Sequence, residues 1–299
     1  MDGKTKIAVL GGDHRQYYAA CQLCECGWDV RLWGLEKEIN VDKRIVACEE
    51  LAQALCGATA VVLPLPAANG DNMLNCPLNF SKTTVSLNYI FSQIERDVTV
   101  IGGRIPKDTA SVWQGKGIKI YDYFDSENFQ IRNAYTTAEA ALSIAMNNLN
   151  KEIRGAKAAI TGYGRIAKHL CNLLHLFGSD ITVAARRESD LAWCEQNGYK
   201  VLNISSGASA LSELLHGYDV IFNTVPFWLF DRAFLEKVDK STVLIELASA
   251  PGGIDVCAAK DLSSNVLWAP SLPGKYAPES AGTLIAQCVH KFLIRRMAL

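Results

Sequence analysis

The residues best suited to chemistry form a glycine turn, GYGRIA, at positions 162–167. The spacing is G-x-G-x-x-A, and the turn lies between the apolar run 157–161 and a segment with apolar residues at helical spacing. In such a turn the first glycine permits a tight bend, and the second lets main-chain amides approach a pyrophosphate. The small third residue lets the helix pack close to the sheet. The pattern predicts a dinucleotide site formed by Gly162, Tyr163, Gly164, Arg165 and Ile166.

The strand that follows this turn indicates which dinucleotide is bound. NAD sites usually place an acidic residue at the end of that strand, where it binds the ribose 2′-hydroxyl. This chain has Arg186 and Arg187 there instead. Guanidinium groups bind a 2′-phosphate through paired, charge-assisted hydrogen bonds, whereas a carboxylate would repel it. The arginines therefore predict NADP as cofactor, and the alternative is that they are only a solvated pair on a loop.

A third apolar run, 219–222, ends in the turn Asn223, Thr224, Val225 and Pro226. Ligands of open α/β sheets bind beside the carboxyl ends of the strands. We expect this turn to flank the cofactor, and the alternative is that Pro226 merely ends a strand.

A first glycine turn, Gly11-Gly12, is followed by charged residues that would obstruct a pyrophosphate. Asp13, His14 and Arg15 suit a small anion instead, with Arg15 binding a carboxylate at a helix N-terminus. Asp13 either holds Arg15 or serves only as the N-cap of the helix. His14 titrates near neutral pH and is a candidate for proton transfer. This turn predicts substrate recognition.

Short apolar runs that alternate with helical segments must position these turns. The expected strands are 6–10, 28–33, 59–63, 98–102, 118–121, 157–161, 180–184, 199–202, 219–222, 242–246 and 266–268. The expected helices include 15–26, 48–56, 164–177, 207–216 and 278–295, with a long connecting helix within 126–155. Such alternation predicts the α/β class, with two doubly wound, Rossmann-like domains and a cleft between them. We expect a substrate-binding domain of residues 1–134 plus 275–299 and an NADP-binding domain of residues 135–274.

Composition excludes several other classes of protein. The net charge of −1 shows no electrostatic footprint for nucleic acid or anionic lipid. No apolar run reaches the roughly 18 residues of a membrane span, and no secretory signal opens the chain, so a cytoplasmic protein is expected. The 10 cysteines lack a second CxxC or a His pair at ligand spacing, so no metal site is predicted. Cys21, Cys24 and Cys26 are interpreted as apolar filler on a helix.

The motifs together resemble a known family, the A subunit of dipicolinate synthase from spore-forming bacteria. The matching segments, collinear from residue 6 to about residue 290, are IAVLGGDHRQ, TTAEAALSIAM, GYGRIAKHL, VAARR, FNTVP, ELASAPGGID and APSLPGKYAPESAG. The resemblance implies NADP-dependent oxidation of a dihydro- or hydroxytetrahydro-dipicolinate precursor in the mother-cell cytoplasm during sporulation. It also implies a partner, the flavoprotein-like B subunit, and we expect a homo-oligomer.

A dicarboxylate substrate requires anion contacts and a proton acceptor. Besides Asp13 and Arg15, the candidates for binding it are Thr137, Ser280 and Thr283. Glu139 is a candidate general base, and the alternative is that it is a solvated charge on the flank of a helix. The family often has a lysine where this chain has Glu279, so an anion contact at this position is not carried over from the family.

Three alternatives remain among two-domain NADP enzymes: relatives of alanine dehydrogenase, of D-2-hydroxyacid dehydrogenases and of shikimate-type dehydrogenases. The absence of histidine from 218–270 counts against the second. A non-catalytic, NADP-binding regulatory protein is a further alternative.

Overall fold

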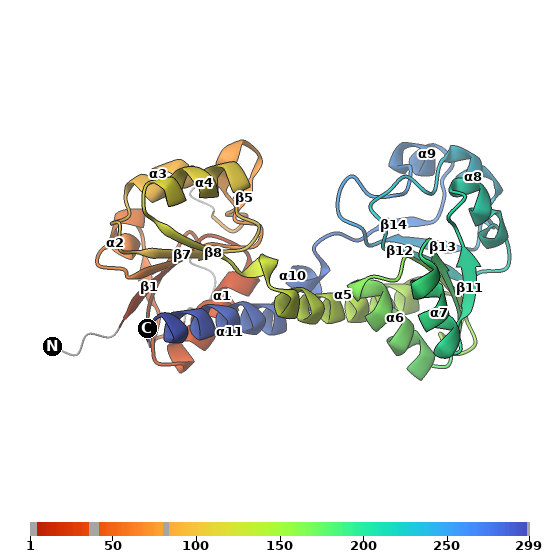
Figure 1. Cartoon of the computed structure of the whole chain (residues 1–299), viewed down its shortest axis with the longest axis horizontal. Helices are drawn as coiled ribbons and strands as arrows, with labels where there is room; N and C mark the ends of the chain where they lie inside the picture. Colours follow the sequence, from red (N-terminus) through yellow and green to blue (C-terminus); the bar gives the residue numbers. More distant parts are fainter. Residues whose placement is uncertain (1–4, 36–41, 80–83, 298–299) are drawn as a thin grey trace. The chain divides into compact units, whose positions relative to one another are not determined.

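The computed structural model describes residues 5–35, 42–79 and 84–297. The chain divides into two compact units, Met1–Asn133 with Ala277–Leu299 and Ala134–Tyr276 (Figure 1). The predicted boundaries, after residues 134 and 274, fall close to these. Each unit is described by itself.

Unit 1 contains a parallel sheet with strand order β3-β2-β1-β4-β7-β8. Strands β2 and β3 are added on one side of β1, and β4, β7 and β8 are added on the other, so the strand order reverses between β1 and β4. Its strands are β1 Lys6–Leu10, β2 Asp29–Trp33, β3 Val46–Cys48, β4 Ala60–Val62, β7 Thr99–Gly102 and β8 Lys119–Asp122, and a small hairpin adds β5 Ala68–Asn69 and β6 Met73–Leu74. Its helices are α1 His14–Glu25, α2 Leu51–Leu55, α3 Leu87–Ser92, α4 Lys107–Gly115 and α11 Pro278–Met297, with 3-10 turns at Gly70–Asn72 and Tyr123–Asp125. Helices α1 and α11 cover one face of the sheet and α2, α3 and α4 cover the other, as Figure 1 shows.

Unit 2 repeats this plan, with strand order β11-β10-β9-β12-β13-β14 and all neighbours parallel. Its strands are β9 Lys157–Thr161, β10 Asp180–Ala185, β11 Lys200–Asn203, β12 Val220–Asn223, β13 Val243–Glu246 and β14 Val266–Trp268. Its helical segments are α5 Glu127–Asn148, which begins in unit 1, α6 Arg165–Leu176, α7 Glu188–Gln196, the 3-10 helix η3 Ala208–Leu214, α8 Arg232–Lys237, α9 Val256–Asp261 and α10 Leu272–Tyr276. The prediction of two doubly wound α/β sheets is confirmed.

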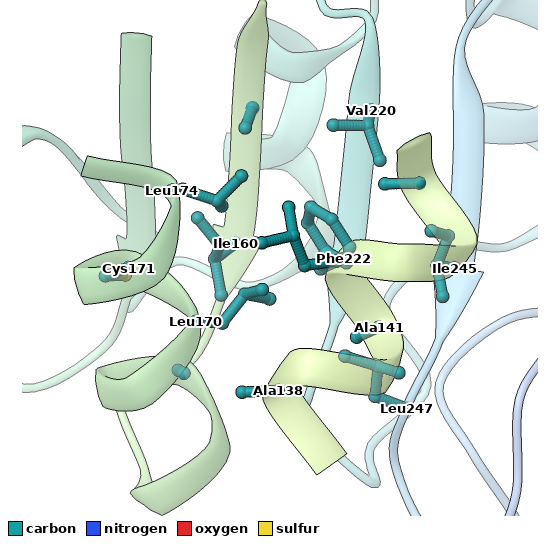
Figure 2. Packing of buried hydrophobic residues seen from close by; sticks show 14 of the residues in the cluster. Ala138, Ala141, Ile160, Leu170, Cys171, Leu174, Val220, Phe222, Ile245 and Leu247 are labelled. Atoms are coloured by element: carbon teal, nitrogen blue, oxygen red, sulfur yellow. The ribbon is translucent and has the colours of Figure 1, made fainter. Parts of the chain in front are cut away.

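The apolar core on one face of the unit 2 sheet holds β9 and α6, the two elements that flank the glycine turn. Figure 2 shows Leu170 and Leu174 of α6 and Ala138 of α5 directed toward Ile160 and Phe222 in the sheet. Phe222 lies opposite Ile160 in the register of β12 and β9, and both side chains are fully buried. Because alanines line α5, that helix packs close to the strands, and burial of this apolar face holds α6 against β9.

Four elements of the structure differ in detail from the prediction. Strand β3 is not among the predicted strands: the apolar run 45–48 is short, and Val46 and Ala47 lie exposed at the sheet edge. The helix expected over 48–56 begins at Leu51. The long helix ends at Asn148, before residue 155, and the Asn148 side-chain amide donates to the carbonyl of Ile144 in its last turn. The segment expected as an α-helix over 207–216 is the 3-10 helix η3, since its buried leucines, Leu211 and Leu214, are three residues apart.

All ten cysteines are free thiols. Cys21 and Cys24 are half-buried, and burial raises the pKa of each, to about 11 for Cys24. Cys26 is exposed, so the interpretation as apolar filler is wrong for that residue. Within 5–35, 42–79 and 84–297, none of the helices combines the length and hydropathy that a bilayer-spanning segment requires.

Candidate functional site

The turn after β9 presents an open main-chain surface at the start of α6. Gly162 has φ +82, and a Cβ on it would lie 2.8 Å from Val225 Cγ2, so this position requires glycine. Gly164 is the N-cap of α6, with φ −82 and ψ −166, and a Cβ on it would meet nothing within 4 Å. Gly164 and Arg165 are exposed, while Ile166 is half-buried against the core. The N-terminus of α6 is therefore accessible beside a glycine that no neighbouring side chain covers.

The turn after β1 has the opposite character. The Gly11 amide donates to the carbonyl of Trp33 and the Gly12 amide donates to the carbonyl of Asn75, each at 2.8 Å. A Cβ on Gly11 would lie 2.9 Å from Leu74 Cδ2, and both glycines are buried. The Gly11 bond has a counterpart in unit 2, where the Gly162 amide donates to the carbonyl of Ala184 at 2.8 Å, so the difference lies at Gly12. The segment that follows β6 covers the first turn and binds the Gly12 amide.

The tightness of this turn predicts a stability effect at Gly12. Its φ is +90 and a Cβ would lie 2.7 Å from Gln16 Cβ. Replacement by alanine combines left-handed backbone strain with a steric overlap, so we expect a loss of about 2 kcal/mol or more in the free energy of unfolding. Urea unfolding measures it. Gly115→Ala is the matched control, because a Cβ there meets nothing within 4 Å. An unchanged urea midpoint for Gly12→Ala would contradict the tight turn.

Asp13 and Arg15 form a closed pair at the start of α1. The Asp13 carboxylate accepts from the Arg15 main-chain amide at 3.0 Å and from its Nε at 2.9 Å, and it accepts from Nη2 at 2.8 Å. Nη2 also donates to the carbonyl of Leu65 at 2.6 Å, and Arg15 is 8% exposed. Asp13 therefore caps the helix and also holds the Arg15 guanidinium, so it does not serve only as an N-cap. The Arg15 guanidinium is held rigidly and its charge is matched by Asp13.

The other substrate candidates of unit 1 lie close to this pair. His14 is the exposed first residue of α1. Ser280 is exposed and Thr283 half-buried in the first turns of α11, on either side of Gly282. A Cβ on Gly282 would lie 2.7 Å from Tyr18 Cβ, so α11 packs directly on the first turns of α1. The fold thus brings Ser280 and Thr283 near the helix start that carries Arg15.

Thr137 and Glu139 lie on α5 in unit 2, where Thr137 is buried and Glu139 is exposed. Their participation in a common site with Arg15, and the cleft between the domains, stay predictions. Tyr163 is half-buried, and burial beside the Cys194 thiol raises the pKa of its phenol to about 12. The phenol is therefore protonated at neutral pH. Among the described residues, no group of three or more His, Cys, Asp or Glu is arranged to hold a metal ion.

The arginine pair lies beside the open turn. Ala184 of β10 lies opposite Thr161 of β9 in the sheet register, so the segments that follow these two strands begin side by side. Arg186 and Arg187 follow β10 directly, both are exposed, and Arg187 is the N-cap of α7. Two cationic side chains are therefore available at the strand end adjacent to Gly162.

The Asn-Thr-Val-Pro turn is bound to the same glycine turn from the other side. Asn223 Oδ1 accepts from Thr161 Oγ1 at 2.6 Å and from the Val225 amide at 3.1 Å, and Thr224 Oγ1 donates to the carbonyl of Thr161 at 2.7 Å. Pro226 is exposed. The buried Asn223 thus fastens the ends of β9 and β12 together.

Sequence reasoning missed two polar residues at the carboxyl ends of the strands. Glu246 ends β13 and is 1% exposed; an acid in the otherwise apolar run VLIE was the available signal. Arg104 follows β7, is exposed, has φ +51 and places its guanidinium 4.3 Å from the centre of the Phe124 ring. Only its position after Gly102-Gly103 marked it in the sequence.

Two family models match successive parts of this chain. Residues 6–124 match the N-terminal domain of the dipicolinate synthase A subunit, and residues 129–253 match the NAD binding domain of the D-isomer specific 2-hydroxyacid dehydrogenases. The second model supports a nicotinamide cofactor in unit 2.

Individual proteins agree with this assignment. The dipicolinate synthase A subunit of Bacillus subtilis (strain 168) is 24% identical over 288 residues, covering 96% of this chain and 95% of that protein. The crystal structure of the dipicolinate synthase A subunit from Bacillus halodurans has a TM-score of 0.83 at 24% identity, covering 97% of each chain. D-lactate dehydrogenase from Escherichia coli, at 14% identity and a TM-score of 0.65, shares the fold over 98% of each chain. The resemblance inferred from the motifs is confirmed: this chain is a homologue of the dipicolinate synthase A subunit, and its dehydrogenase-type NAD-binding domain supports an oxidoreductase role.

Proposed function

We propose that this chain is an NADP-dependent dehydrogenase that oxidises a dihydro- or hydroxytetrahydro-dipicolinate precursor to dipicolinate. The contrast between its two glycine turns carries the proposal. The helix N-terminus at Gly164 is exposed, with no atom within 4 Å of the place of a Cβ, whereas at the first turn both glycines are buried and the Gly12 amide is bound to the carbonyl of Asn75. A pyrophosphate therefore binds in unit 2, and unit 1 recognises the substrate.

The residues of unit 2 fit a phosphorylated dinucleotide. The start of α6, at Gly162, Gly164 and Arg165, binds the pyrophosphate, and Arg186 and Arg187 bind the 2′-phosphate. The turn 223–226 lines the nicotinamide end. When bound, oxidised NADP supplies the acceptor for a hydride from the substrate.

Unit 1 supplies the anion contacts for a dicarboxylate. Arg15, kept in place by Asp13, presents its remaining donors to one carboxylate, and Ser280 and Thr283 add hydroxyl donors from α11. Aromatisation of a dihydropyridine ring removes one proton along with the hydride, and a hydroxytetrahydro precursor also loses water. Glu139 accepts the proton, with Thr137 beside it on α5 and His14 as the second candidate base.

The assembly is proposed by similarity. Because the homologue is named as the A subunit of a synthase, we infer that a flavoprotein-like B subunit is the partner, and that the chain forms a homo-oligomer in the mother-cell cytoplasm during sporulation.

The purified chain is expected to form NADPH from NADP and a dihydrodipicolinate precursor, measured by NADPH absorbance. Alanine and D-lactate serve as control substrates, and we expect no turnover of either. Turnover of one of them would support another dehydrogenase. NADPH binding without turnover, with activity appearing only after the B subunit is added, would support the regulatory alternative. Failure to bind NADP or NADPH would refute the proposal.

A further inference from the structure

Glu246 is a buried carboxylate whose hydrogen-bond partners among the described residues are all uncharged. Its oxygens accept from Asn223 Nδ2 at 2.8 and 2.9 Å and from the Ala248 amide at 2.9 Å. They also accept from the amides of Gly253 at 2.8 Å and Ile254 at 3.0 Å. No ion pair is formed with Glu246 in the described part of the chain.

Burial of a carboxylate without a cation costs several kcal/mol unless its oxygens are satisfied. Here five N–H···O contacts supply that compensation. In every contact an N–H group donates to a Glu246 oxygen, so a carboxylate, which only accepts, matches its surroundings. A glutamine at this position would place its own N–H groups against these donors.

These donors come from two segments that are separate in sequence. Asn223 begins the turn 223–226, and the three amides belong to the loop 248–254 after β13. The two segments approach closely, because a Cβ on Gly253 would lie 2.5 Å from both Asn223 Nδ2 and the Phe227 carbonyl oxygen. Asn223 in turn bonds Thr161 at the end of β9, next to Gly162. The Asn223 side chain therefore ties together the ends of β9, β12 and β13.

The side of the sheet on which this cluster lies indicates which half of the cofactor it serves. Strand β10, with Arg186, lies on one side of β9, and β12 and β13 lie on the other. A dinucleotide crosses the carboxyl edge where the strand order reverses, which in this sheet is between β9 and β12. With the 2′-phosphate at Arg186, the nicotinamide half lies toward β12 and β13.

We propose that Glu246 is a positioning residue that builds the nicotinamide end of the cofactor site before the cofactor binds. This inference rests on the proposed function. The carboxylate acts through the turn 223–226 and the loop 248–254, which it holds at fixed separation, and it has no role at the adenosine end.

The experiment compares two ligands of one site in Glu246→Gln. We expect the affinity for NADPH to fall about tenfold or more, since buried donors lose their acceptor, and the affinity for 2′,5′-ADP to stay within about twofold. Both are measured by calorimetry. Glu246→Asp keeps the charge but shortens the side chain, so we expect an intermediate loss. Thr242→Val is the matched control: Thr242 is buried directly before the same strand and donates to the Tyr218 carbonyl at 2.7 Å. This control is expected to change neither affinity.

Equal losses for both ligands in Glu246→Gln, or no loss for either, would overturn the inference. If the variants do not fold, amide hydrogen exchange on the unliganded wild type still tests the inference. Slow exchange of Ala248, Gly253 and Ile254 without cofactor is expected, and exchange that slows only after NADPH is added would also overturn it. Failure of the wild type to bind either ligand would instead refute the proposed function.

Discussion

Replacement of Gly164 by serine is expected to weaken NADPH binding about 100-fold and to leave the free energy of unfolding within about 0.5 kcal/mol of the wild type. Serine is a favourable N-cap, the backbone at Gly164 is already extended, and a Cβ there meets no atom within 4 Å. The folded unit therefore accepts the side chain. The pyrophosphate does not, because that side chain occupies the surface along which it approaches the main chain.

Fluorescence titration with NADPH and urea unfolding test these two effects separately. Gly115→Ser is the matched control, because a Cβ on Gly115 in unit 1 also meets nothing within 4 Å and the residue is remote in sequence from both glycine turns. Unchanged NADPH affinity in Gly164→Ser would show that the dinucleotide does not lie on this turn.

Replacement of Arg186 by aspartate is expected to reverse the cofactor preference. Loss of a charge-assisted contact with the 2′-phosphate and the new repulsion weaken NADPH binding by about 100-fold. The introduced carboxylate accepts from the ribose hydroxyls of NADH, so NADH affinity rises. Stability is expected to change little, because Arg186 is exposed and no ion pair with it occurs in the described residues.

Parallel titrations with NADPH and NADH measure the preference. Arg154→Asp makes the same change of charge at an exposed residue of unit 2 that precedes the amino end of β9. Since it is far along the strand from the glycine turn, we expect it to leave the ratio of the two affinities unaltered. If Arg186→Asp also leaves that ratio unaltered, the assignment of NADP as the preferred cofactor fails.

Local patterns in the sequence were sufficient for the scaffold of the site. Continuous apolar runs predicted the buried parallel strands, because strands covered on both faces need no polar alternation. The spacing of Gly162 and Gly164 predicted an open turn before a helix, and an N-cap was one of the two roles considered for Asp13, because an aspartate before a helix commonly caps it. These features depend on residues that are close neighbours in the chain.

The hydrogen bonds of Gly12 and of Glu246 depended instead on partners distant in sequence. The charged residues after Gly11-Gly12 predicted substrate recognition there, but only the structure shows that the carbonyl of Asn75 binds the Gly12 amide. Glu246 looked like a strand end until Asn223 and the loop 248–254 were placed around it. The sequence itself thus determined the strand–turn–helix units and the residue types that stand at each glycine turn. The tertiary structure alone decided which amides and buried charges are satisfied, because hydrogen bonds between distant segments exist only once the sheet has brought its strand ends together.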